Sequence, residues 1–165
     1  MELNIFEQMG TAMKQVADNG AFLTVKSGNK VNTMTIGWAL LGRMWSKPMM
    51  VVAVRYSRYT YELLQKSDSF SVSVPLKEEM KKELAFCGSK SGRDVDKFQA
   101  CKMTAQDGKN ENTSIVKECN LHYECKIVYK QTLEPELIQT DYIRKAYDNH
   151  DYHVMIYGEV LSCYE

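Results

Sequence analysis

The segment Arg55–Glu62 combines two arginines, two aliphatic hydroxyl side chains and a predicted helix start. Guanidinium groups, hydroxyls and the free backbone N–H groups of a helix N-terminus are the groups that bind phosphate. Here they come from Arg55, Ser57, Arg58 and Thr60. Taken alone, the segment is more typical of a capped helix with solvated arginines, with Thr60 as the N-cap. A phosphate site here therefore needs support from other segments.

A second segment, residues 32–38, places amide and hydroxyl side chains and a glycine on a predicted strand. Its residues are Asn32, Thr33, Met34, Thr35, Ile36, Gly37 and Trp38. Glycine in a strand lets another group approach the backbone closely. Such a strand can offer N–H and C=O groups to the polar edge of a flat heterocycle. The commoner explanation of the pattern is a half-buried strand with its polar residues outward.

The third segment, residues 87–98, is rich in glycine and small polar residues, so it can form a loop against a ligand. The candidate binding residues are Cys87, Gly88, Ser91, Gly92 and Lys97, with further charge from Arg93. The alternative is a surface loop in which Asp94 caps a short helix. A negative helix C-terminus raises the pKa of a thiol, so we expect Cys87 to be a buried structural cysteine.

Metal and disulfide chemistry are not expected. His150 and His153 are three residues apart, but no third or fourth ligand is near them in the sequence, so we expect a polar turn with surface histidines. The five cysteines are widely spaced, with no C-x-x-C pair. The sequence also has no P-loop, Rossmann glycine motif, H-E-x-x-H or G-x-S-x-G.

Composition narrows the class of protein further. The 165 residues carry 21 basic and 21 acidic side chains, which argues against a general nucleic-acid binder or a polybasic membrane anchor. The N-terminus lacks the features of a secretory signal. The longest mostly apolar run, residues 36–45, is too short to span a bilayer. We therefore expect a cytoplasmic protein.

The hydrophobic pattern predicts one mainly β domain over residues 1–165. The expected helices are 4–17, 60–66 and 77–86, with a short one near 94–100 in an irregular stretch from 89 to 114. The expected strands are 21–26, 31–41, 49–54, 69–74, 121–128 and 152–163. Because no regular βαβ alternation is present, we expect an antiparallel barrel with peripheral helices. Residues 129–149 are a polar insertion of undefined structure.

The order of these motifs resembles the flavin reductase-like family, which includes flavoredoxins. The matching runs are N-T-M-T-I-G-W, R-Y-S-R-Y-T-Y-E-L-L, F-C-G-S-K-S-G-R-D-V-D-K-F, L-H-Y-E-C-K-I-V and H-D-Y-H-V-M-I-Y-G-E-V. The resemblance implies a Greek-key split β-barrel, non-covalent FMN and a homodimer. It also implies that 32–38 lies along the flavin ring and ribityl chain. Arg55, Ser57, Arg58 and Thr60 would receive the phosphate, and the loop 87–97 would close over the flavin.

Two departures stand out: many relatives have a serine near Ile36-Gly37, and a shorter hairpin where this chain has 129–149. The expected reaction is transfer of a hydride from NAD(P)H, or of electrons from a redox protein, to FMN. Met34, Trp38 and Phe98 are candidates for the apolar wall of the ring site. The alternatives are a non-catalytic FMN or electron-transfer protein, a barrel that oxidises a phosphorylated pyridoxine, and a cofactor-free structural barrel.

Overall fold

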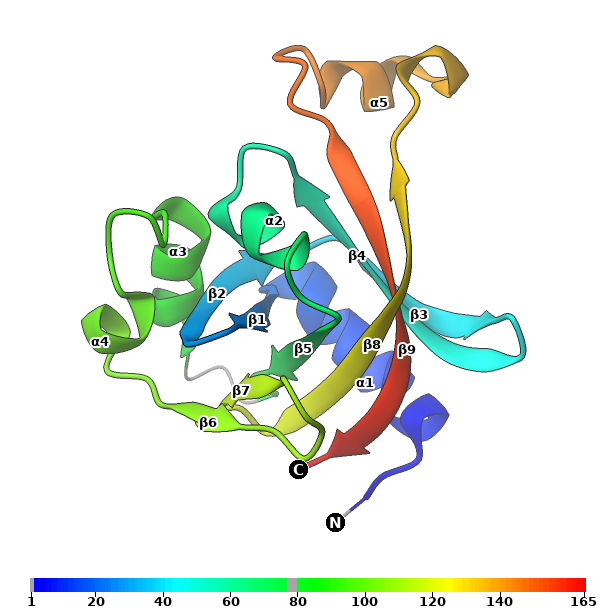
Figure 1. Ribbon diagram of the computed structural model, residues 1–165. Helices are drawn as coiled ribbons and strands as arrows, with labels where there is room; N and C mark the ends of the chain where they lie inside the picture. The colour runs from blue at the N-terminus through cyan, green and yellow to red at the C-terminus, as the bar shows by residue number, and fades with distance from the viewer. Residues whose placement is uncertain (1, 77–79) are drawn as a thin grey trace.

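The computed structural model describes residues 2–76 and 80–165, and within them seven strands form one antiparallel sheet (Figure 1). The strands are β1 Ala21–Ser27, β2 Lys30–Ile36, β3 Ala39–Met44, β4 Lys47–Arg55, β5 Ser69–Val74, β8 Leu121–Thr132 and β9 His153–Tyr164. Their order across the sheet is β2-β1-β5-β8-β9-β4-β3. Two short strands, β6 Ala105–Asp107 and β7 Ser114–Val116, form a separate pair.

The sheet must curl, because its two edge strands are consecutive in the chain. Only Gly37 and Trp38 separate β2 from β3, although these strands lie at opposite ends of the sheet order. The backbone N–H of Ala53 in β4 donates to the carbonyl of Trp38 at 3.2 Å, which ties this junction to the barrel wall. The predicted mainly β, split-barrel architecture is confirmed.

The barrel interior is filled by aliphatic and aromatic side chains from alternate strand positions. Its buried residues include Leu23, Val25, Val52, Val54, Phe70, Val72, Leu121, Tyr123 and Ile156. Helix α1, Ile5–Asp18, starts at Asn4, whose side chain accepts from the N–H of Phe6. The helix buries Ala12 and Val16 against this core, as its apolar spacing predicts.

Helices α2 Tyr59–Leu64, α3 Lys81–Ser89 and α4 Lys97–Cys101 lie beside β1 and β2 (Figure 1). A second apolar cluster, including Phe22, Leu84, Phe98 and Val116, packs α3 and α4 on the outer face of the sheet. The helix predicted at 77–86 runs further, to Ser89, while residues 77–79 lie outside the described residues.

Two predicted caps are wrong. The N-cap of α2 is Arg58 instead of Thr60, and it makes no side-chain capping bond. The N-cap of α4 is Asp96 instead of Asp94, and its carboxylate accepts from the N–H of Gln99. In each case the observed N-cap lies two residues from the expected one.

The strand predicted at 31–41 is also wrong: the chain turns at Gly37-Trp38 and continues as a second strand across the barrel. In contrast, β8 runs four residues beyond its predicted end at 128, to Thr132. The 3-10 helix η2, Pro135–Leu137, and α5, Asp141–Lys145, then form the tip of the β8–β9 hairpin. We call residues 133–152 the hairpin extension; it projects beyond the barrel body (Figure 1). No helix in the described ranges is long and apolar enough to cross a membrane.

Candidate functional site

A groove follows the free edge of β2, which among the described strands pairs with β1 alone. Cavities of about 200, 120 and 760 Å³ succeed one another along it, and neighbouring cavities share lining residues. We call them the ring cavity, the middle cavity and the outer cavity. Residues 34–38 line the ring cavity consecutively, and 29–32 line the outer cavity in the same way. Successive side chains of a strand point to opposite faces. Because consecutive residues line these cavities, the backbone edge of the strand borders the groove, and not one side-chain face.

The ring cavity is bounded by aromatic and basic side chains at the end of β2. Its lining residues are Met34, Thr35, Ile36, Gly37, Trp38, Ala53, Arg55, Arg58 and His153. The indole of Trp38, 52% exposed, lies on the ring of His153 with the ring centroids 4.7 Å apart. A planar apolar surface therefore stands beside polar strand-edge groups.

His153 is buried, contrary to the predicted surface histidine. Its Nδ1 lies 2.8 Å from the hydroxyl of Tyr147 in the hairpin extension. Burial, and then the positive charge of Arg55, lower the pKa of His153 to about 4. The imidazole is therefore neutral at neutral pH and lines the ring cavity with no charge of its own.

Arg55 is held by the hairpin extension. Its guanidinium donates to the backbone carbonyls of Asp151 and Ala146 and lies 5.2 Å from the centroid of the Tyr147 ring. Arg55 lines the ring cavity and not the middle cavity. Arg55 therefore shares the ring cavity with Arg58 but is absent from the middle cavity, which Arg58 and Thr60 line. The cause is a contact more than ninety residues away in the chain.

The middle cavity is strongly basic. Its lining residues are Asn32, Met34, Ser57, Arg58, Tyr59, Thr60, Cys87, Ser89, Lys90, Ser91, Gly92, Arg93 and Lys97. Among these described residues four are basic and none is acidic. Arg58, at the start of α2, donates to the carbonyl of Gly88 at 3.3 Å. This lining can donate several charge-assisted hydrogen bonds to an anion.

Lys97 is the deepest of these cations, with only 4% of the residue exposed. Its Nζ donates to the carbonyl of Cys87 at 2.8 Å, and no carboxylate within the described residues forms an ion pair with it. Burial lowers the pKa of Lys97. The Cys87 thiol is also buried, and burial followed by its neighbour Cys101 raises its pKa to about 12. The predicted burial of Cys87 is confirmed.

Asn32 lines the middle cavity and not the ring cavity. Its Nδ2 donates to the hydroxyl oxygen of buried Thr60 at 2.9 Å. That contact leaves the Thr60 hydroxyl hydrogen available to another acceptor. Gly92 faces the same amide so closely that a Cβ there would lie 2.1 Å from Asn32 Oδ1. Glycine is therefore required where this loop passes β2.

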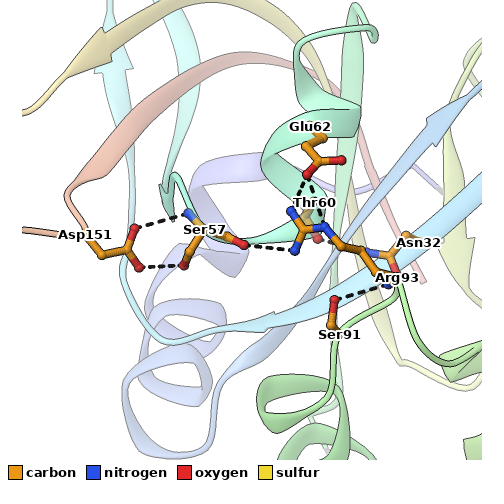
Figure 2. Close-up of polar contacts among 7 residues, drawn as sticks. All are labelled: Asn32, Ser57, Thr60, Glu62, Ser91, Arg93 and Asp151. Carbon is orange, nitrogen blue, oxygen red and sulfur yellow. Dashed lines mark hydrogen bonds and ion pairs between the residues drawn. The ribbon is translucent and has the colours of Figure 1, made fainter. Parts of the chain in front are cut away.

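Arg93 fastens the loop between α3 and α4 to the start of α2, as Figure 2 shows. Its Nε donates to Glu62 at 3.1 Å and its Nη1 to the carbonyl of Ser57 at 3.1 Å. The hydroxyl of Ser91 accepts from the backbone N–H of Arg93. On the other side, Asp151 accepts from both the hydroxyl and the N–H of Ser57. The loop and the hairpin extension therefore hold residues 57–62 from two sides.

Several predicted site residues have their side-chain or backbone polar groups bonded within the protein, or line another part of the groove. The Thr33 hydroxyl is buried and donates to the carbonyl of Leu23, so its side chain does not reach the groove. Thr35 donates to the carbonyl of Leu84 at 2.6 Å while its residue borders the ring cavity. Gly88 contributes its carbonyl to Arg58. Phe98 lines the outer cavity and not the ring cavity.

Sequence reasoning missed His153 and underrated Arg93. His153 had no local signal, because it shares its strand face with the partly exposed Met155 and Tyr157 and is buried by contacts with Trp38 and Tyr147. Arg93 had no local signal, because its partner Glu62 is 31 residues away.

Comparison with known proteins gives the class of this split barrel. The flavin reductase like domain matches residues 13–165. This chain belongs to the flavin reductase-like family. It is also 31% identical over 107 residues, 65% of this chain, to an uncharacterised protein of Archaeoglobus fulgidus, of whose length the match spans only 59%.

Solved structures agree with this membership. Flavoredoxin from Methanosarcina acetivorans is 28% identical, with a TM-score of 0.69 over 89% of this chain and 68% of that one. The FMN-binding protein from Thermus thermophilus, solved with bound 1-cyclohex-2-enone, is 25% identical, with a TM-score of 0.70 over 88% of this chain and 69% of that one.

Proposed function

We propose that this protein is an FMN-binding oxidoreductase, with the FMN phosphate in the middle cavity. The observation that carries the proposal is the buried ammonium of Lys97, which faces a cavity with no acidic lining residue. A buried cation without an anionic partner is costly, and a phosphate dianion offsets that cost while accepting charge-assisted hydrogen bonds. FMN fits the family to which the chain belongs and the chemistry of the donors present.

The proposed phosphate ligands are Arg58, Thr60, Lys97 and the loop residues Ser91 and Gly92. Asn32 orients the Thr60 hydroxyl, so that its hydrogen points away from the amide and toward the phosphate. Ser57 and Cys87 shape the wall, since the Ser57 hydroxyl is held by Asp151 and the Cys87 thiol is buried. These roles differ from the sequence-based assignment mainly in removing Arg55 from the phosphate.

The flavin ring is proposed to lie in the ring cavity, along 34–38. When bound, FMN supplies the redox chemistry by accepting a hydride or electrons. Met34 and Trp38 provide an apolar contact for the ring, and strand-edge N–H groups orient its polar edge. Arg55 and Arg58 also line this cavity, so their positive charge favours the negative charge that the ring gains on reduction.

NAD(P)H is the proposed electron donor. Without a Rossmann motif to hold a nicotinamide separately, its ring would stack on the flavin at the open side of Trp38. His153 is neutral there, so it can donate or accept one hydrogen bond without repelling a cationic nicotinamide product.

A protein electron donor or acceptor is the second candidate, as in an electron-transfer flavoprotein. One observation favours it: Leu137 and Tyr142 are 71% and 75% exposed on the hairpin extension, whose Tyr147 contacts the ring-cavity residue His153. Exposed apolar side chains of this size are typical of protein contact surfaces. A slow reaction with both NADH and NADPH, with tightly held flavin, would favour this function over a reductase.

The decisive experiment is the visible absorption spectrum of the purified protein, with the released pigment identified by mass after denaturation. FMN is expected. A colourless protein whose absorption does not change when FMN is added would refute the proposal. Anaerobic stopped-flow reduction by NADH and by NADPH then separates the two candidate functions.

We also propose a cytoplasmic homodimer of this 1–165 domain. Trp45 and Tyr129 are exposed and lie with Tyr157 in one aromatic group beside the β3–β4 hairpin. Such a group is more apolar than an ordinary solvated surface and suits an interface between copies. Light scattering should give a mass of twice 19.0 kDa, and a monomer at micromolar concentration would exclude this assembly.

A further inference from the structure

The hairpin extension differs in charge from the rest of the chain. Its residues 133–152 carry five acidic and two basic side chains, which is a net charge of −3 with His150 neutral. The whole chain carries 21 of each sign, so the remainder has a net charge of +3. Because the extension projects beyond the barrel body (Figure 1), this negative charge stands where a partner can reach it.

An apolar groove lies within this acidic segment. Its cavity, about 460 Å³, is lined by Gln131, Thr132, Leu133, Glu134, Leu137, Ile138, Gln139, Thr140, Ile143 and Met155. Among these described lining residues Glu134 alone is charged. An exposed apolar patch within a polar rim is the usual form of a protein docking surface.

The rim of this groove is acidic. Glu134 lines the groove and Glu136 lies in η2, and both are exposed. Arg144 does not offset these two charges, because it forms an ion pair with Asp141 at 3.1 Å. Lys145 is the other basic side chain of the extension. A partner with lysine or arginine side chains around an apolar centre therefore matches this surface in charge.

Aromatic rings in contact connect the extension to the ring cavity. Trp38 and His153, which both line that cavity, have ring centroids 4.7 Å apart. The Tyr147 ring lies 5.6 Å from His153, and the Tyr152 ring lies 5.2 Å from Tyr147. A partner on the extension would thus be joined to the proposed flavin site by packed side chains.

We propose that the hairpin extension docks a basic one-electron redox protein, to which electrons pass from the flavin. The inference rests on the proposed function, since it needs FMN in the ring cavity and NAD(P)H as the source of electrons. Two electrons leave each reduced flavin, and each reduces one partner molecule. The flavin is reoxidised in this exchange, and it releases two protons to water.

Binding is measured on the full chain, with ferric cytochrome c as the basic one-electron probe. This measurement does not depend on flavin. Isothermal titration should give an affinity that falls about tenfold or more between about 20 and about 300 mM NaCl, because salt screens solvent-exposed charges. Cytochrome c with acetylated lysines is the matched probe, and at low salt it should bind about tenfold more weakly or worse.

Glu134→Lys combined with Glu136→Lys reverses two charges beside the groove. At low salt this variant should bind cytochrome c about tenfold more weakly, and the reduced, FMN-loaded protein should reduce the heme more slowly in proportion. The control, Glu111→Lys with Glu165→Lys, makes the same change in net charge. These residues lie in the β6–β7 loop and at the C-terminus, at the other end of the molecule (Figure 1). The control should bind within about threefold of the wild-type protein.

Leu137→Ser removes exposed apolar surface without changing charge, and it keeps the test valid if the lysines disturb the extension. It should weaken binding about threefold at both salt concentrations. The inference is overturned if cytochrome c does not bind at low salt, if the acetylated probe binds equally well, or if the variants and the control do not differ. It is also overturned if the lysine variants change self-association in light scattering and not cytochrome c binding, because the surface then joins two copies. Failure of FMN to bind would instead refute the proposed function, and the binding measurement would show this separately.

Discussion

The ammonium of Lys97 and the backbone carbonyl of Cys87 lie 2.8 Å apart in the wall of the middle cavity. This bond connects the first residue of α4 to the last turn of α3, so the two helices together aim a buried cation at the start of α2. A carbonyl satisfies only one of the three donors of an ammonium group and none of its charge. The site is therefore organised before any anion arrives.

Lys97→Met should weaken FMN binding without lowering the stability of the apoprotein. The side chains have similar length, and methionine removes a buried charge that has no anionic partner, so the melting temperature of the apoprotein should stay equal or rise. FMN affinity should fall by about 10- to 100-fold, the equivalent of about 1.5–3 kcal/mol for a hydrogen bond to a charged group, while riboflavin affinity stays unchanged. Isothermal titration and thermal unfolding measure both effects.

The control for this variant is Lys117→Met, which removes an exposed lysine that lines none of the three cavities. It should alter neither flavin affinity nor melting temperature by a measurable amount. If Lys97→Met lowered FMN and riboflavin affinity equally, Lys97 would have no phosphate role.

Gly92→Ala should weaken FMN without unfolding the barrel. Its Cβ would lie 2.1 Å from Asn32 Oδ1 and 2.9 Å from the Tyr59 ring, so the loop or the Asn32 amide must move. Either movement disturbs the Asn32–Thr60 bond at the phosphate end. We expect a loss of FMN affinity of about tenfold, with a smaller loss for riboflavin.

Gly10→Ala is the matched control, because a Cβ at Gly10 in α1 meets nothing within 4 Å. It should raise the free energy of unfolding by about 0.5–1 kcal/mol, as expected for a glycine in a helix interior. Equal FMN affinity in the two variants would show that the Gly92 contact has no part in binding.

Buried histidines should make the protein less stable in mild acid. Burial lowers the pKa of both His153 and His122 from 6.5 to about 4. The unfolded chain then binds more protons than the native one, so the free energy of unfolding is greatest above pH 6.5 and falls as the pH drops toward 4. The loss is up to about 3 kcal/mol for each histidine.

Urea unfolding at several pH values between 7.5 and 4 measures this effect. His153→Gln should flatten the pH dependence over that window, because glutamine has no proton to gain. Identical slopes for the wild-type protein and the variant would show that His153 titrates normally in the folded state.

Glu124→Gln should destabilise the loop that precedes β7. The buried carboxylate of Glu124 accepts from the backbone N–H groups of Lys109 and Asn110 at 2.7 and 2.8 Å, and from the hydroxyls of Thr113 and Tyr164. Burial alone would raise the pKa of Glu124, but these donors hold it below its usual value. A glutamine at this position would point its own N–H groups at these donors. We expect this to lower the free energy of unfolding by about 2–4 kcal/mol.

Chemical denaturation gives this loss directly. Glu118→Gln is the control, since Glu118 also accepts from a backbone N–H, that of Thr104, but is exposed. Its effect should stay below about 1 kcal/mol. Comparable losses in the two variants would mean that burial of the Glu124 network adds no stability.

Local sequence patterns are sufficient to predict which segments line the groove and the order in which they occur along the chain. The strand 21–26, the buried strand near 49–54 and the segments around Arg58 and Lys97 follow from local periodicity and turn chemistry, which need no distant contacts. Local signals were also sufficient to predict the first helix to within one residue at each end.

Which of these residues face one another depends on tertiary contacts. Asn32 bonds Thr60, Arg55 bonds the hairpin extension, and His153 packs against Trp38. The predicted strand 31–41 is divided at Gly37. Each of these outcomes depends on a partner from a distant segment. The curl that brings the two edge strands together, and the long β8–β9 hairpin, create those contacts, and no local pattern encodes either one.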